Sequence, residues 1–230
     1  MKPFLVRPAS RLKGVISLPG DKSIAHRAVI LSAIAQGQTR IKNLPLNQDC
    51  LSTVNSLKKL GVKIKRLKNG SFVVFGRGAY GLREPALPIF IGESGTTMRL
   101  LAGLLAGQDF KTTLRPGRSL AKRPMLRITA PLRMMGARIK ARPGTRGEEY
   151  PPLIITGSRL KTISYRMPVA SAQVKSAILL AGLYAKGLTR LYEKIKTRDH
   201  TERMLKVFKA DIKVQKNTIT IKGGRELTSP

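Results

Sequence analysis

The sequence predicts an α/β fold built from three copies of one unit, and two observations support this prediction. A nine-residue pattern recurs about every 75 residues, at 57–65, 132–140 and 205–213, with apolar residues at places one, four and eight and a basic residue at place nine. An Ala- and Leu-rich stretch with the composition of a buried helix precedes each copy, and small polar residues open it. Strands that alternate with such helices are typical of an α/β domain.

Each unit is expected to follow the order βαβαββ. The first unit, residues 14–78, is expected to form strands at 15–18, 39–42, 62–66 and 72–75 and helices at 22–36 and 50–60. The second, residues 86–158, should form strands at 88–91, 112–115, 137–141 and 153–156 and helices at 95–106 and 124–135. The third, residues 161–223, should form strands at 163–167, 189–193, 212–214 and 218–221 and helices at 172–186 and 201–209. Residues 76–88 and 143–152 are rich in Gly and Pro and are expected to be surface loops.

The composition is that of one domain with a sizeable core, because 42% of the 230 residues are hydrophobic. No apolar run is long enough to span a membrane, and residues 1–20 lack the continuous apolar segment of a secretory signal. Cys50 is the only cysteine, so the chain cannot form an internal disulfide, and the cytoplasm is the expected compartment. We expect this cysteine to pack in the core and not to act as a nucleophile.

The net charge of +32 has two interpretations. Forty-four Lys and Arg against twelve Asp and Glu would suit a nucleic-acid binder. The charge is spread along the whole chain, however, and aromatic residues make up only 5%, too few for a platform on which bases stack. We therefore expect the charge to favour solubility and to attract small anionic substrates, with nucleic acid adhering only non-specifically at low salt.

Residues 19–27, PGDKSIAHR, have the pattern of a helix start that binds an anion. Asp21 is the expected N-cap. The free N–H groups and the dipole of a helix N-terminus favour negative charge, and side chains that donate hydrogen bonds follow Asp21 at this position. These donors are Lys22, Ser23 and, one turn later, Arg27. An ordinary basic helix start is the alternative interpretation. Equivalent helix starts at 93–97 (ESGTT) and 171–176 (SAQVKS) predict that three helix N-termini meet at one anionic ligand.

Six motifs resemble the N-terminal half of the 3-phosphoshikimate 1-carboxyvinyltransferase family, the enolpyruvylshikimate phosphate synthases. They are GDKSIAHRA, GESGTTMRLL, SLAKRPM, LRMMGARI, SAQVKSAILLAGLYA and TRDHTERML, in family order. The family fold has two globular domains of three βαβαββ units each, so the resemblance implies one enolpyruvyl-transferase-type domain at residues 14–230. It also implies that the second domain is absent from these residues, and that residues 1–13 match a segment packed with that domain. The related UDP-N-acetylglucosamine enolpyruvyl transferases share the architecture, but the KSxxHR and RDHTER segments favour the shikimate enzymes.

The resemblance implies transfer of the enolpyruvyl group from phosphoenolpyruvate to the 5-hydroxyl of shikimate 3-phosphate, with release of phosphate. This addition and elimination belongs to chorismate and aromatic amino acid biosynthesis and needs no metal or organic cofactor. A separate chain carrying the C-terminal half is the expected partner for turnover. A phosphate-binding module without catalysis and a nucleic-acid-binding module derived from this half remain as alternatives.

The resemblance also assigns roles to individual residues. Lys22 matches the lysine that touches both substrates and helps to move a proton, so it is the candidate catalytic residue. The candidates for binding shikimate 3-phosphate are Lys22, Ser23, Arg27, Ser171, Ala172, Gln173 and Arg198. The candidates for binding phosphoenolpyruvate are Lys22, Gly95, Thr96, Arg123 and Gln173. Each also has a plain structural alternative, either a helix cap or a solvated basic side chain.

Other polar residues inside these motifs are expected to have structural roles. His26 and His200 are assigned to packing, and Asp49 and Asp199 to helix capping outside the catalytic set. Glu93 stands where asparagine is common in the family, and it places a negative charge near a site for anions.

Overall fold

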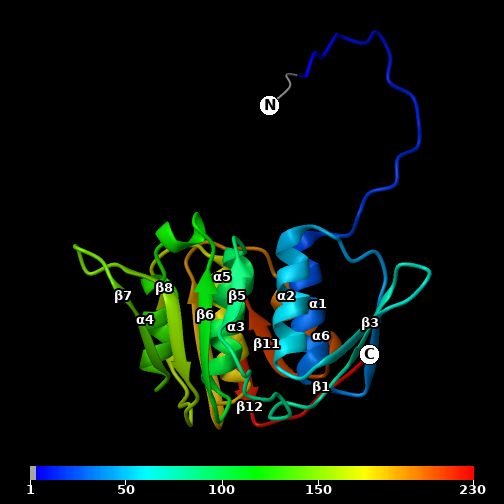
Figure 1. The fold of residues 1–230 in the computed structure, drawn as a ribbon. Coiled ribbons are helices and arrows are strands. Elements are labelled where there is room, and N and C mark those ends of the chain that lie inside the picture. Colours follow the sequence, from blue (N-terminus) through cyan, green and yellow to red (C-terminus); the bar gives the residue numbers. More distant parts are fainter. Residues whose placement is uncertain (1–3) are drawn as a thin grey trace.

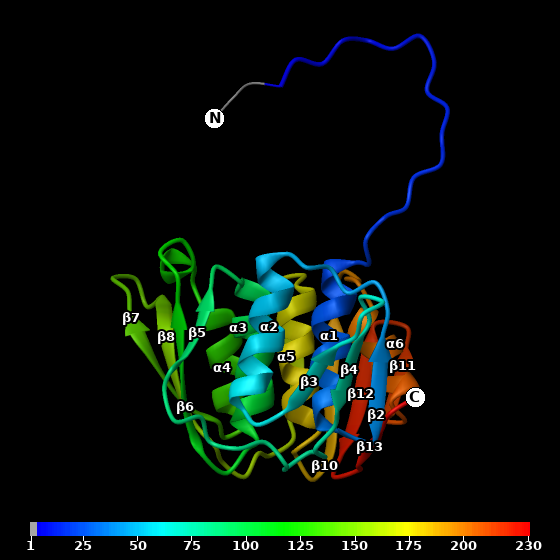
Figure 2. The same cartoon turned by 45° about the vertical axis from the view of Figure 1, so that its right-hand side comes forward.

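Three nearly parallel helices form the centre of the computed structural model, which describes residues 4–230, and sheets and further helices surround them (Figures 1 and 2). The central helices are α1 (Lys22–Ile34), α3 (Gly95–Ala106) and α5 (Ala172–Gly182). Buried residues lie on every side of them, as apolar composition all round a helix requires. The outer helices are α2 (Gln48–Lys59), α4 (Leu126–Met134) and α6 (His200–Val207).

The second and third units have the same sheet topology. The second unit contributes β5 (Ile89–Gly92), β6 (Lys111–Pro116), β7 (Arg138–Pro143) and β8 (Glu149–Thr156), in the order β5-β6-β8-β7. The third contributes β9 (Ser164–Met167), β10 (Gly187–Glu193), β11 (Asp211–Gln215) and β12 (Thr218–Gly223), in the order β9-β10-β12-β11. In both, the first two strands are parallel and the other pairs are antiparallel. The α/β fold predicted from the repeated pattern is therefore confirmed.

The sheet of the first unit has the same order but lacks the parallel edge strand. It consists of β2 (Gln38–Ile41), β4 (Phe72–Phe75) and β3 (Lys63–Arg66), in the order β2-β4-β3. Two short segments that were not predicted, β1 (Ala35–Gln36) and β13 (Leu227–Thr228), pair in parallel beside this sheet. The helix expected at 22–36 thus ends at Ile34, and its last two residues are extended.

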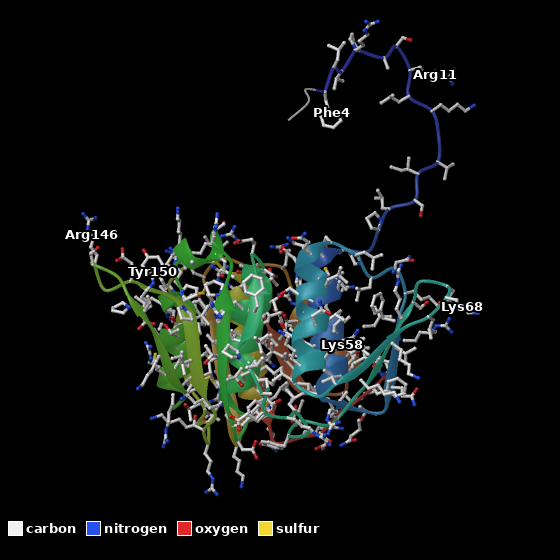
Figure 3. All side chains as sticks on the ribbon, viewed as in Figure 1. Phe4, Arg11, Lys58, Lys68, Arg146 and Tyr150 are labelled. Carbon is white, nitrogen blue, oxygen red and sulfur yellow. The ribbon has the colours of Figure 1, made fainter. Side chains whose placement is uncertain are left out.

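The strand predicted at residues 15–18 is wrong. These residues make no ladder, and Val15, Ile16 and Leu18 are exposed. The segment that includes Phe4 and Arg11 runs away from the rest of the molecule (Figure 3). The short apolar run fits a strand locally, but a strand also needs a neighbour that satisfies its N–H and C=O groups. Along the described residues 4–20, the first backbone hydrogen bond to the rest of the protein is that of the Gly20 amide, which donates to the Asn43 carbonyl oxygen at 3.1 Å.

The surroundings of Cys50, the lengths of the helices and the distribution of charge can be compared with the sequence. Cys50 is free and buried, as expected for a core residue. Within residues 4–230, no helix is both long and apolar enough to cross a bilayer. Basic side chains such as Lys68 and Arg146 lie on opposite sides of the molecule (Figure 3), which agrees with a charge spread over the whole chain.

Candidate functional site

The central helices begin at the same end of the molecule (Figure 2), and each start is capped by a side chain. Asp21 accepts a hydrogen bond from the Ile24 amide, Ser94 from Thr97, and Ser171 from Val174. These caps confirm the helix starts that the sequence predicted. The remaining free N–H groups of three helix N-termini give this end of the molecule a partial positive charge that favours an anion.

Side chains at these helix starts are bonded to one another. The amide nitrogen of Gln173 donates to Thr96 Oγ1 at 2.9 Å, and its oxygen accepts from Arg99 Nη1 at 2.7 Å, so α5 and α3 are joined. Arg198, in the connection before α6, donates from Nη1 to Ser23 Oγ at 3.1 Å and so reaches α1. The predicted site residues of all three units therefore lie together.

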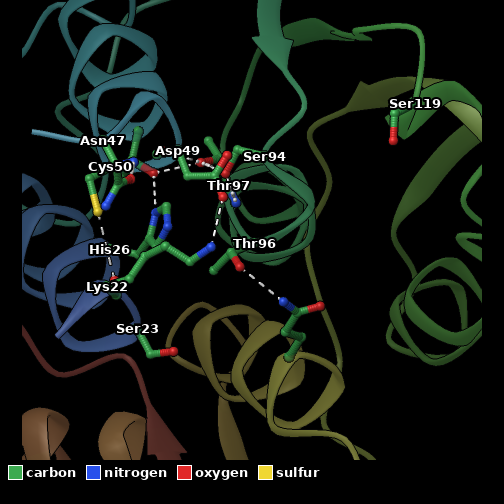
Figure 4. A network of polar contacts seen from close by, with 12 residues as sticks. Lys22, Ser23, His26, Asn47, Asp49, Cys50, Ser94, Thr96, Thr97 and Ser119 are labelled. Atoms are coloured by element: carbon green, nitrogen blue, oxygen red, sulfur yellow. Dashed lines mark hydrogen bonds and ion pairs between the residues drawn. The ribbon is translucent and has the colours of Figure 1, made fainter. Parts of the chain in front are cut away.

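Lys22, the candidate catalytic residue, is held by a carboxylate. Its Nζ lies 2.8 Å from Asp49 Oδ2, and both side chains remain partly exposed. The cap role expected for Asp49 is wrong, because Asn47, two residues earlier, caps α2 by accepting from the Cys50 amide. Asp49 is thus free to point toward α1, as Figure 4 shows.

A buried chain of polar groups begins at His26, one helical turn after Lys22 (Figure 4). His26 Nδ1 is 2.6 Å from Thr53 Oγ1, which is 2.7 Å from Thr97 Oγ1, and Thr97 in turn contacts Ser94 Oγ. Burial lowers the pKa of His26 to about 4, although the Asp49 carboxylate opposes this shift. His26 is therefore neutral at pH 7 and links α1, α2 and α3, which agrees with the structural role expected for it.

Arg27 is buried, and its guanidinium binds neighbouring helices. Nε donates to Thr201 Oγ1 at 2.5 Å, Nη1 to the Ser23 carbonyl oxygen at 2.8 Å, and Nη2 to Ser176 Oγ at 2.6 Å. Desolvation lowers its pKa, while the nearby Glu202 opposes that shift. Arg27 thus joins α1 to α5 and α6. A direct contact with a ligand stays a prediction.

Two arginines flank the start of α3. A Cβ on Gly95 would lie 2.9 Å from Arg99 Nη1 and 3.6 Å from Arg123 Nη1, so the absence of a side chain at Gly95 leaves room for both guanidinium groups. Desolvation and the charge of Arg123 lower the pKa of Arg99. Arg99 was missed in the sequence, although its position one helical turn after Gly95 was a usable signal.

Glu93 stabilises the segment that carries Arg123. One carboxylate oxygen, Oε2, accepts from the Leu120 amide at 2.6 Å, at the start of the short 3₁₀ helix η1 (Leu120–Lys122). Arg123 follows directly and donates to Ser119 Oγ at 3.3 Å. The negative charge of Glu93 therefore fixes a loop and does not simply face the anion site.

The remaining motif residues lie at the same helix starts. Ala172 is the first residue of α5, and its carbonyl oxygen accepts from Ser176 Oγ at 2.6 Å. Asp199 occupies the N-cap position of α6, but its side chain makes no capping bond. His200 Nδ1 is 4.0 Å from Asp21 Oδ1. These residues shape the margin of the site between α1, α5 and α6.

The site is an open surface. A cavity of about 680 Å³ lies at the opposite end of α3 and α5, where Gln108, Asp109 and Tyr184 line it, and it contains none of the predicted site residues. The open surface combines helix N-termini, Lys22, several hydroxyl groups and the arginines Arg99, Arg123 and Arg198, while Arg27 is buried beside it. Such donors can bind phosphate and carboxylate groups at fixed positions.

Comparisons with known proteins agree with the fold of the chain. The sequence profile of EPSP synthase (3-phosphoshikimate 1-carboxyvinyltransferase) matches residues 6–230. A relative from Desulforamulus reducens named 3-phosphoshikimate 1-carboxyvinyltransferase is 47% identical, and the match covers 99% of this chain and 53% of the relative. A relative of the same name from Geobacillus kaustophilus is 51% identical, and the match covers 95% of this chain and 50% of the relative. The structure of EPSP synthase from Acinetobacter baumannii superimposes with a TM-score of 0.89 at 46% identity, covering 94% of this chain and 48% of that one. The chain spans about half the length of the curated relatives it matches.

Proposed function

The chain belongs to the EPSP synthase family, and from this premise we propose that it binds shikimate 3-phosphate and forms one wall of a phosphoenolpyruvate site. The observation that carries the proposal is the meeting of three capped helix starts with Lys22, Arg123 and Arg198 on one open surface. Three N-termini and fixed cationic donors suit two substrates that both carry phosphate and carboxylate groups.

Shikimate 3-phosphate would occupy the side of the site between α1 and α5. Ser23 and Arg198 are already hydrogen-bonded to each other at 3.1 Å, so their donors converge on one place, and Ser171 caps the neighbouring helix. We assign the phosphate to this group. Gln173, held by Thr96 and Arg99, would contact the ring.

Phosphoenolpyruvate would lie at the start of α3. Gly95 and Thr96 supply backbone and hydroxyl donors there, and Arg123 offers a guanidinium that can bind a carboxylate or phosphate through two parallel bonds. Lys22 would lie between the two substrates, because its partner Asp49 belongs to α2, which packs against both α1 and α3.

The proposed reaction is addition followed by elimination. The 5-hydroxyl of shikimate 3-phosphate attacks C2 of phosphoenolpyruvate while C3 takes up a proton, and the tetrahedral intermediate then loses phosphate. Lys22 would carry a proton at Nζ, and the arginines would stabilise charge on the carboxylate and phosphate oxygens. Water must be excluded during such chemistry, so this open wall would need an opposite wall from the other half of the enzyme.

Titration calorimetry of the 230-residue chain with shikimate 3-phosphate at moderate salt tests the binding proposal. We expect one site per chain, and we expect that a DNA duplex, titrated in parallel, binds only at low salt. Absence of shikimate 3-phosphate binding by a folded sample would contradict the proposal, and salt-resistant DNA binding would favour the nucleic-acid alternative.

Phosphate release tests the catalytic part. We expect little release from both substrates with the 230-residue chain alone, and restored release when the C-terminal half of the Geobacillus kaustophilus relative is added as a separate chain. The rate should saturate with the concentration of that half. Full turnover by the chain alone would show that the catalytic groups assigned to the other half lie in this chain. Failure of a folded second half to restore turnover would favour a non-catalytic phosphate-binding module.

A further inference from the structure

A fully buried lysine lies one helical turn below the start of α5. Lys175 has no exposed surface, and its Nζ lies 3.0 Å from Glu193 Oε2 and 2.6 Å from Glu202 Oε1. None of the substrate roles proposed above uses this group. Because a buried charge is costly unless it is paired, the position of this ammonium group needs an explanation.

The two carboxylates bound by Lys175 mark the two ends of one loop. Glu193 is the last residue of β10, and Glu202 lies in the first turn of α6. The residues between these elements, 194–199, include Arg198. A single ammonium group therefore holds both ends of the loop that places Arg198 at the start of α1.

Further contacts tie the same loop to its ends. Thr197, next to Arg198, donates from Oγ1 to Glu193 Oε1 at 2.6 Å, so the carboxylate that binds Lys175 also fixes the middle of the loop. Among the described residues, Glu202 Oε2 has no hydrogen-bond partner, so the hydrogen-bonded ion pair of Glu202 is the one with Lys175, while the charge of Arg27 lies nearby. Loss of the lysine would leave two buried carboxylates close together and would push the ends of the loop apart.

We propose that Lys175 is a positioning residue for the anion site: it fixes loop 194–199 so that the Arg198 guanidinium stays beside Ser23. This inference rests on the phosphate-binding role proposed for Arg198. A well-packed apolar core often gives as much stability as a buried ion pair, so the group is better explained by the position it fixes than by stability alone.

Hydrogen exchange of the ligand-free chain tests the positioning directly. Lys175→Met keeps a long unbranched side chain without charge, and we expect faster exchange at the two amides that anchor the loop, Glu193, which donates to the Asn217 carbonyl oxygen, and Arg203, which donates to the Asp199 carbonyl oxygen. Lys206→Met, an exposed lysine on α6, is the matched control and should exchange like the parent chain. Unchanged protection of the Glu193 and Arg203 amides in a folded Lys175→Met chain would overturn the inference.

A second variant covers the case in which Lys175→Met does not fold. Lys175→Met combined with Glu193→Gln and Glu202→Gln removes the ammonium group and both carboxylates together, so neither carboxylate is left unpaired. The buried Arg27, which lies near Glu202, keeps its hydrogen bonds to Thr201, Ser176 and the Ser23 carbonyl oxygen. This variant should fold and still show faster exchange at the Glu193 and Arg203 amides. Normal protection of these two amides in it would overturn the inference equally.

A double-mutant cycle on shikimate 3-phosphate affinity shows whether Lys175 acts through Arg198. We expect Arg198→Ala to weaken binding about 10-fold or more, as for a lost charge-assisted bond, and Lys175→Met to weaken binding less. In the Arg198→Ala background, Lys175→Met should have no further effect. Additive losses would mean that Lys175 is only structural. No effect of Arg198→Ala would refute the phosphate role of Arg198, while the exchange experiment would still decide the loop positioning.

Discussion

Gly103 of α3 packs against the backbone of Ala177 of α5 so closely that a Cβ on the glycine would lie 2.1 Å from the Ala177 carbonyl oxygen. This contact brings the two helices together along their length. At their N-terminal ends, the same approach lets Gln173 reach Thr96 and Arg99. The separation of these two core helices therefore determines whether the two proposed substrate subsites stay adjacent.

We predict that Gly103→Ala destabilises the chain by about 1–3 kcal/mol, because the added methyl group must push the α5 backbone away. The gain in helix propensity, up to about 1 kcal/mol, acts in the opposite direction and is smaller. Urea denaturation measures the difference. Gly14→Ala is the control, since a Cβ there would meet nothing within 4 Å. Equal stability of Gly103→Ala and the parent chain would show that α3 and α5 can separate at little cost.

The ion pair between Lys22 and Asp49 places a negative charge beside the anion site. We predict that Asp49→Asn tightens binding of shikimate 3-phosphate about 2- to 5-fold, the size expected for a partly exposed charge pair. The gain should shrink as salt is raised, because salt screens exposed charges. Calorimetry at two salt concentrations checks this, and Asp109→Asn, the same charge change at the other end of the molecule, is the control. Weaker binding by Asp49→Asn would mean that orienting Lys22 matters more than repulsion of the ligand.

The buried imidazole of His26 makes stability depend on pH. Its pKa is about 4 in the folded chain and 6.5 when unfolded, so the unfolded chain binds more protons between these values and stability falls as the pH drops through this window. At pH 4.5 this loss should reach about 2–3 kcal/mol relative to pH 7. His26→Gln keeps a polar group near Thr53 without titrating.

We therefore predict that stability falls less between pH 7 and pH 4.5 in His26→Gln than in the parent chain. Denaturant unfolding of both proteins at both pH values measures the difference, and the carboxylates they share cancel in the comparison. An identical pH dependence of the two proteins would contradict a buried neutral His26.

Local signals in the sequence predicted the helix starts but not every contact between helices. The side chains of Asp21 and Ser171 cap helices by accepting hydrogen bonds from amides three residues later, and such short-range patterns can be recognised in the sequence. The bond from Arg27 to Thr201 joins residues 174 positions apart, and no local pattern indicates it. Arg27 was therefore expected only as a ligand contact, whereas the structure uses its donors to join helices.

The strand at 15–18 and the cap at Asp49 failed for related reasons. A short run of apolar residues shows that a strand could form, but only the fold shows whether a partner strand lies beside it. An aspartate near a helix start can cap it, but Asn47 stands at the position where capping geometry is met. In both cases the sequence offered a suitable residue type, and the tertiary structure decided its use.

We predict that Lys22 binds shikimate 3-phosphate directly. Lys22→Ala should weaken binding of shikimate 3-phosphate by about 1.5–3 kcal/mol, because a charge-assisted hydrogen bond to the ligand is lost. It should also leave Asp49 without its partner, so that the remaining carboxylate repels the ligand and adds to the loss. Calorimetry at moderate salt measures the affinity.

Lys65→Ala, which removes an exposed lysine from β3, is the control for general charge. Combining Lys22→Ala with Asp49→Asn separates the two effects, since the double variant should recover the part due to the unpaired carboxylate. If Lys22→Ala binds as tightly as Lys65→Ala, Lys22 is an ordinary solvated lysine at a helix start and the catalytic assignment fails.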